Sequence, residues 1–234
     1  MSYYQDPVPP HSNPYAGYPY QDSRAPRGLA VASAILAGVV TLVQIGSGLT
    51  APSAADTFAE AAREGRPAFD VFTAYDAVTI LYLPSLLAAY IVTCLWLSRS
   101  RTLLGERFSG YPHARSKVWV WLGWWVPIVN LWFPYQVVRD IRLGSIAGRA
   151  DSGILAGWWA CWLIFLVGTR ASGRMTGDTQ ASDPSTFDAL PWIEGVNTVA
   201  AVIGFACWLG IIRQITRGQE ARLAAPSGSD PTRP

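Results

Sequence analysis

The chain has little of the chemistry on which most enzymes depend. Its 234 residues include only two histidines, His11 and His113, and three cysteines. The scarcity of histidine excludes most metal sites and most Ser-His-Asp catalytic triads. The cysteines, at positions 94, 161 and 207, have the spacing of neither a disulfide framework nor a metal site. We therefore expect no enzymatic activity, no catalytic or metal-binding residues and no cofactor.

Charged residues are scarce as well. They make up 15% of the chain, compared with about 25% in an ordinary soluble domain, whereas 50% of the residues are hydrophobic and 11 are tryptophan. The 18 basic and 16 acidic residues leave a net charge of +2, which is too small to indicate a nucleic-acid partner. This composition predicts a protein that lies in the lipid bilayer.

Five long apolar runs, almost free of charge, predict helices in the membrane. They cover residues 28–50, 77–97, 118–138, 152–169 and 195–212. A hydrocarbon core of about 30 Å requires about 20 helical residues, and a segment in lipid must satisfy its own backbone hydrogen bonds. An all-α fold follows from these two requirements.

The third run, residues 118–138, differs from the others because it contains Pro127 and Pro134, each of which interrupts a helix. Between Val118 and Val126 a helix would rise only about 14 Å, about half the hydrocarbon thickness. If this run enters and leaves on one side, 14 of the 18 basic residues lie in cytoplasmic segments, whereas a full crossing leaves nine on each side. We predict a polytopic membrane helical bundle of four transmembrane helices plus a proline-broken re-entrant or interfacial segment. A kinked full span is the alternative.

These assignments divide the chain into one membrane domain, residues 29–215, and two tails. The expected spans are about 29–50, 75–97, 152–169 and 191–212. Residues 1–28, rich in proline and tyrosine, and residues 216–234 offer too little apolar burial to offset the entropy of ordering. We predict that both are disordered cytoplasmic tails of a multi-pass inner-membrane protein.

A stretch in the third run resembles a known family. The sequence WLGWWVPIVNLWFPYQVVRDI at 121–141 follows a stretch that contains Trp96, Arg99 and Arg101. Together they resemble the bacterial membrane-protein family catalogued as domain of unknown function 4328, common in actinobacteria, and the likeness covers about residues 29–215. The residues of the motif are Gly123, Trp124, Val126, Pro127, Asn130, Leu131, Pro134, Val138, Arg139 and Asp140. Arg142 stands where an aromatic residue would be expected. The resemblance implies a multi-span bacterial membrane protein and no particular activity.

Two acids lie nearest the hydrocarbon and are candidates for an intramembrane polar site. Asp76 and Glu194 each stand at the entry of an apolar run, on the same predicted side of the membrane. An acid inside a membrane helix is a functional candidate by default, but a carboxylate in a first helical turn also interacts favourably with the helix dipole. If their helices are neighbours, the two acids could share a proton or a cation. Asn130, between the two prolines, is expected either to satisfy free carbonyls or to bind a ligand.

The remaining features concern partners. The segment 98–117 carries five cations and one acid, which predicts either contact with anionic lipid headgroups or a purely orienting role. Small residues every fourth position, as in 30–38 and 153–161, predict close helix packing within the bundle, in a homo-oligomer or against an unidentified membrane protein. We expect a binding or scaffolding module of the cell envelope. The alternative is a small transporter or channel with a site at the broken third segment.

Overall fold

The computed structural model describes residues 24–107, 116–146, 153–180 and 183–225. Within these ranges the chain is helical apart from short connections, and four helical segments are long and apolar enough to cross a membrane. They are α1 (Arg27–Arg63), α2 with α3 (Ala74–Thr79 and Tyr82–Arg107), α6 (Gly153–Thr176), and α7 (Leu190–Ala224) with the 3-10 turn η3 (Pro184–Ala189) that precedes it. The prediction of an all-α bundle with four membrane-length helices is confirmed.

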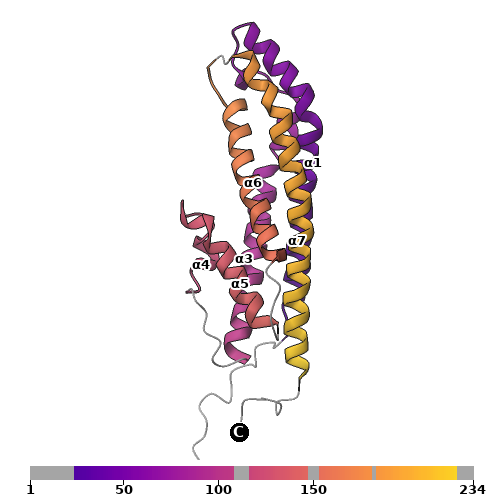
Figure 1. The fold of residues 1–234 in the computed structure, drawn as a ribbon, viewed down its shortest axis with the longest axis vertical. Coiled ribbons are helices and arrows are strands. Elements are labelled where there is room, and N and C mark those ends of the chain that lie inside the picture. Colours follow the sequence, from indigo (N-terminus) through magenta and orange to yellow (C-terminus); the bar gives the residue numbers. More distant parts are fainter. Residues whose placement is uncertain (1–23, 108–115, 147–152, 181–182, 226–234) are drawn as a thin grey trace, which may run out of the picture.

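Helix α7 organises the bundle. It runs beside both α6 and α1, and α1 also packs on α3 (Figure 1). Small residues bring α6 and α7 together, since a Cβ added at Gly204 would lie 3.1 Å from the Cβ of Cys161. Such close backbone approach is what stabilises helix pairs in lipid, where burial of apolar surface contributes little.

The two longest helices extend beyond the expected spans. Past residue 50, α1 continues to Arg63 because its alanines and Phe58 pack on Phe187 of η3, with ring centroids 5.6 Å apart. At the other end, α7 continues through residues 216–224, where the sequence predicted a disordered tail. It stays helical there because Gln219 is fully buried and donates a hydrogen bond from Nε2 to Ser145 Oγ at 3.2 Å. Residues 1–23 and 226–234 of the predicted tails lie outside the described residues.

The third apolar run forms no membrane-length helix. It contains α4 (Trp119–Leu122), the 3-10 turn η2 (Val129–Leu131) and α5 (Phe133–Ser145). The longest of these, α5, has 13 residues and rises about 20 Å, which is less than the hydrocarbon thickness. In Figure 1, α4 and α5 lie beside the lower half of the bundle, and α3 ends and α6 begins in that same half. We refer to residues 116–146 as the broken segment.

The two prolines of the broken segment act differently from each other. Pro134 stands in the first turn of α5, where a backbone N–H would have no partner in the helix, and so it begins a helix rather than interrupting one. Pro127 precedes Ile128, whose φ of 64° lies in the left-handed region. A β-branched residue in this region is strained by about 1–3 kcal/mol. The break in the run therefore falls at Pro127–Ile128.

Tryptophan side chains attach the broken segment to the bundle. Trp124 packs edge-on against Trp162 of α6, and the indole N–H of Trp159 donates to the Leu131 carbonyl at 3.1 Å. Next to Trp159 on α6, Trp158 stacks on Trp208 of α7 with a centroid distance of 5.0 Å. The hydrogen bond from Trp159 gives the Leu131 carbonyl of η2 a donor on α6.

Candidate functional site

Glu194 is the centre of a polar cluster inside the bundle. It is the fifth residue of α7 and only 3% exposed. Its Oε1 accepts a hydrogen bond from the Tyr75 hydroxyl at 2.9 Å, and its Oε2 accepts one from Gln44 Nε2 at 2.7 Å. Buried acids are usually paired with a cation. Among the residues that the structure describes, no cation forms an ion pair with Glu194.

The hydrogen bonds continue away from Glu194 on two sides. Gln44 accepts a hydrogen bond at Oε1 from the Tyr82 hydroxyl. Thr198, one turn after Glu194, donates to the Glu194 carbonyl at 2.8 Å and lies 3.3 Å from Gln44 Nε2. The Glu194 cluster, defined as Gln44, Tyr75, Tyr82, Glu194 and Thr198, therefore links α1, α2, α3 and α7.

The sequence of each helix explains how these side chains meet. On α1, the buried polar residues Ser33, Thr41, Gln44 and Ser47 recur at helical spacing and form an inward-facing stripe. The approach of α1 and α7 depends on Gly48, because a Cβ at this position would collide with the Thr198 hydroxyl. A bulkier residue at position 48 would therefore push Glu194 away from Gln44.

Asn197, next to the Glu194 cluster, has unused hydrogen-bonding capacity. It is 1% exposed, and neither its amide nitrogen nor its amide oxygen has a hydrogen-bond partner in the described part of the chain. It faces Gly168 of α6, where an added Cβ would lie 2.5 Å from Asn197 Cγ. One turn further along α6, Ser172 is 2% exposed and lies against the Tyr75 hydroxyl. A buried polar group without a partner costs about 1–3 kcal/mol, so such a group calls for an explanation.

The structure places Asp76 in a different role from Glu194. The Asp76 carboxylate accepts hydrogen bonds from the backbone N–H and the hydroxyl of Thr73, at 2.8 and 2.7 Å. Thr73 in turn caps the first turn of α2, and the two residues form a capping box. The neighbouring residue Tyr75, rather than Asp76, contacts Glu194.

The sequence singled out Glu194 as a candidate but predicted none of the residues that contact it. In the run 28–50, Gln44 is the single polar residue that is not serine or threonine. A strongly polar side chain in an apolar run indicates a polar contact inside the bundle, so Gln44 could have been predicted as a partner. Asn197 and Thr198 follow Glu194 at the i+3 and i+4 positions and so share its face of α7. Tyr75 and Tyr82 gave no signal, because tyrosine is common at the ends of membrane helices.

The residues of the family motif mainly pack the broken segment. A Cβ at Gly123 would lie 2.7 Å from the Trp119 carbonyl oxygen and 3.3 Å from Phe133 Cβ, so the chain turns tightly there. The Trp124 indole donates to the Val120 carbonyl at 3.1 Å. Asn130 Oδ1 is buried and accepts no hydrogen bond from the described residues.

At the end of the motif, polar side chains join α5 to α3 and α7. Arg139 is exposed, whereas Asp140 lies close enough to attract Arg101 of α3 electrostatically. Arg142, where an aromatic residue was expected, is 3% exposed and donates from Nε to Gln214 Oε1 at 2.7 Å. The guanidinium group thus replaces apolar packing by a hydrogen bond to α7.

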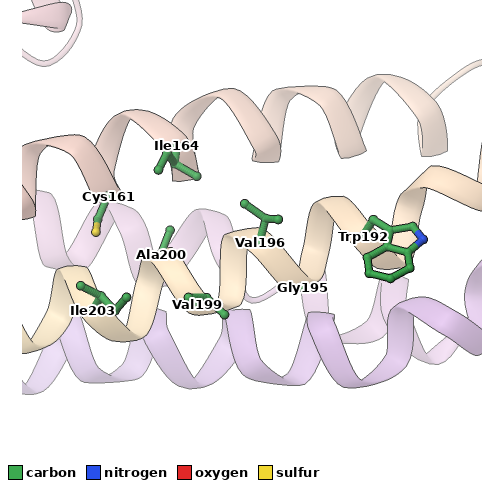
Figure 2. A pocket seen from close by; sticks show the side chains of 8 residues that line it. All are labelled: Cys161, Ile164, Trp192, Gly195, Val196, Val199, Ala200 and Ile203. Carbon is green, nitrogen blue, oxygen red and sulfur yellow. The ribbon is translucent and has the colours of Figure 1, made fainter.

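An apolar groove of about 490 Å³ lies between α6 and α7. Figure 2 shows the side chains that line it, which include Cys161, Ile164, Trp192, Val196 and Ile203. Trp192 is 79% exposed and supplies the single side-chain N–H among the lining residues. Besides this N–H and the Cys161 thiol, the described lining is apolar, and it does not include the Glu194 cluster.

Comparisons with curated proteins and with solved structures found no match. A family model described as a domain of unknown function (DUF4328) matches residues 67–219. The matched region contains α2, α3, the whole broken segment, α6 and most of α7, and so it includes Tyr75, Tyr82 and Glu194 but not Gln44. Because the match covers more than half of the chain, the protein belongs to the family of domain of unknown function 4328.

Proposed function

We propose that this protein is a non-enzymatic binding module of the cell envelope, and that it binds a proton or a small cation at Glu194. The supporting observation is a buried carboxyl group whose side-chain partners, the Tyr75 hydroxyl and the Gln44 amide, are both neutral. An uncompensated charge is costly in a medium of low dielectric constant, so the site favours either a protonated acid or a bound cation. Acids that face the interior of a membrane bundle commonly mark ion and proton sites.

The groups around Glu194 suit this proposal. Among the described residues, the titratable groups that face it are Tyr75 from α2 and Tyr82 from α3, while α1 contributes the Gln44 amide. Asn197, one turn further along α7, adds a buried amide oxygen without a hydrogen-bond partner in the described chain, and Ser172 of α6 lies against the Tyr75 hydroxyl. Binding is favoured over scaffolding because the polar groups lie inside the bundle, whereas a scaffold would need a recognisable outer surface.

Labelling with a fluorescent hydrophobic carbodiimide tests the site, since this reagent modifies protonated carboxyl groups in apolar surroundings. With the full chain in lipid nanodiscs, we expect labelling that Glu194→Gln abolishes and that decreases either with rising pH or with added Na⁺ or K⁺. Glu220→Gln is the matched control, because Glu220 lies exposed on the same helix. Sensitivity to pH alone identifies a proton site, and protection by one alkali cation identifies a cation site. Wild-type labelling no greater than that of Glu194→Gln at any pH, in the absence of salt, would overturn the proposal.

Transport is the second candidate function. It is favoured by the inward stripe of α1, which places Ser33, Thr41, Gln44 and Ser47 along the interior of the bundle. The candidate site for transport is the Glu194 cluster, rather than the broken segment that the sequence suggested. It predicts proton or Na⁺ flux into proteoliposomes that Glu194→Gln abolishes and Glu220→Gln leaves intact. Absence of flux from a protein that still shows cation-sensitive labelling would leave binding as the function.

We propose further that the protein lies in the inner membrane with both termini in the cytoplasm. Four membrane-length helices are an even number of crossings, and with the broken segment on the inner side 14 of the 18 basic residues are cytoplasmic. Reporter fusions after Ser145 and at the C-terminus are both expected to report cytoplasm. A periplasmic signal at both positions would mean that the broken segment crosses the membrane.

A further inference from the structure

A second cavity, of about 330 Å³, lies between the C-terminal part of α3 and the start of the broken segment. Among the described residues, the cations that line it are Arg101 from α3 and Lys117 just before α4. Arg101 is 7% exposed and donates to the Ser116 carbonyl at 3.4 Å, which ties its guanidinium to the broken segment. Lys117 is exposed, so the cavity has one buried and one accessible positive group.

Both charged side chains in the described lining of the cavity, Arg101 and Lys117, are cations. An anion placed between two cationic side chains interacts favourably with both of them. Ser98 and Thr102, one turn apart on α3, add two hydroxyl donors to the lining. Guanidinium, ammonium and hydroxyl groups together are typical ligands of phosphate.

The other wall of the cavity is apolar. Val118, Val120 and Trp121 line it, and Val118 is 50% exposed. Outside the cavity, α3 presents Ile91 and Leu95 to its surroundings, 41% and 40% exposed. Arg101 lies near the end of a membrane-length helix, which is the level at which lipid headgroups are found.

We propose that this cavity binds the phosphate group of an anionic phospholipid, whose acyl chains lie along the exposed apolar face of α3. The sequence suggested contacts with anionic headgroups anywhere in residues 98–117. The cavity restricts the contacting residues to Arg101, Lys117, Ser98 and Thr102. An anionic lipid is favoured over a zwitterionic one, because a choline or ethanolamine group would bring a third cation to the site. The inference is independent of the Glu194 cluster.

Native mass spectrometry of the full chain, released from detergent and titrated with phosphatidylglycerol or phosphatidylcholine, tests the proposal. We expect preferential binding of phosphatidylglycerol that Lys117→Gln weakens about fivefold, the effect of removing one cation near a lipid surface. Lys117→Arg keeps the charge and should retain binding. The matched control is Arg99→Gln, which removes a cation from an exposed position of α3 two residues before Arg101. Its effect should be less than twofold, because Arg99 does not line the cavity.

Three results would overturn the inference. An equal loss of phosphatidylglycerol in Lys117→Gln and Arg99→Gln would show that general surface charge, rather than the cavity, attracts the lipid. Equal binding of the two lipids would show that the cavity does not select an anionic lipid. Displacement of phosphatidylglycerol by millimolar inorganic phosphate would show that the cavity binds free phosphate instead. Because Lys117 is exposed, the Lys117→Gln variant is expected to fold normally.

Discussion

Gln44→Leu is expected to lower the free energy of unfolding by about 3 kcal/mol, although leucine fills a similar volume. The substitution removes the donor to Glu194 Oε2 and the acceptor of the Tyr82 hydroxyl together. The Glu194 carboxyl group stays buried and the Tyr82 hydroxyl half-buried, and a hydrogen bond to a charged group contributes about 1.5–3 kcal/mol. The measurement is reversible unfolding in mixed micelles, followed by helical circular dichroism. Gln180→Leu, at an exposed glutamine, is the control and should change stability by less than about 0.5 kcal/mol.

A double-mutant cycle separates the Gln44–Glu194 contact from the rest of the effect. Glu194→Leu also destabilises, since it removes the shortest hydrogen bond of the Gln44 amide and the carboxylate acceptor of the Tyr75 hydroxyl. With both residues replaced by leucine, the mismatch between them disappears, and the loss should be smaller than the sum of the single losses by at least about 1 kcal/mol. Strictly additive losses would mean that the contact contributes nothing to stability.

The number and type of helices could be predicted because lipid leaves the chain few alternatives. Backbone groups in hydrocarbon must be paired within the segment, so a long apolar run has to form a helix. The ends of α1 and α7 could not be predicted in this way. They depend on contacts between residues far apart in sequence, such as Phe58 with Phe187 and Gln219 with Ser145. Considered alone, the polar residues in the last part of α7 predict a disordered tail.

The partners of Glu194 could not be predicted from the sequence either. A carboxylate beside an apolar run indicated that Glu194 could form a polar site, yet the sequence suggested Asp76 as its partner. Successive residues of a helix point about 100° apart, so Tyr75 and Asp76 cannot both face α7. The capping box with Thr73 holds the Asp76 side chain at the start of α2 and leaves Tyr75 to enter the bundle. The choice between the two depends on where the helix begins, which is the least predictable feature of a sequence.

Arg142 shows how a departure from the family pattern is accommodated. An aromatic residue at this position would be expected to pack by apolar contact, whereas Arg142 is buried and bonds to Gln214 of α7. Nearby, Arg222 of α7 donates to the Gly144 carbonyl. The pairing of these polar groups across α5 and α7 becomes visible only when the two helices are placed side by side.

Gly218→Val tests how closely α5 and α7 must approach. A Cβ at Gly218 would overlap the Ser145 carbonyl oxygen and lie 2.9 Å from the Ser145 carbonyl carbon. These are backbone atoms and cannot rotate away, so α5 has to move. Overpacking of this kind lowers the free energy of unfolding by about 1–3 kcal/mol. The displacement would also break the hydrogen bonds of Gln219 with Ser145 and of Arg142 with Gln214, so the upper part of this range is expected.

Two measurements distinguish this effect from the change in helix propensity. Gly218→Ala improves intrinsic propensity by about 1 kcal/mol but introduces the same clash, so it should still destabilise the protein. Gly173→Ala on α6 is the matched control, because a Cβ there meets nothing within 4 Å, and it should be neutral or stabilising. Backbone amide hydrogen exchange should become faster in α5 of the Gly218 variants and stay unchanged in α1. Unchanged exchange in α5 would mean that the broken segment is held by its tryptophan contacts with α6, and that the hydrogen bonds between α5 and α7 contribute little.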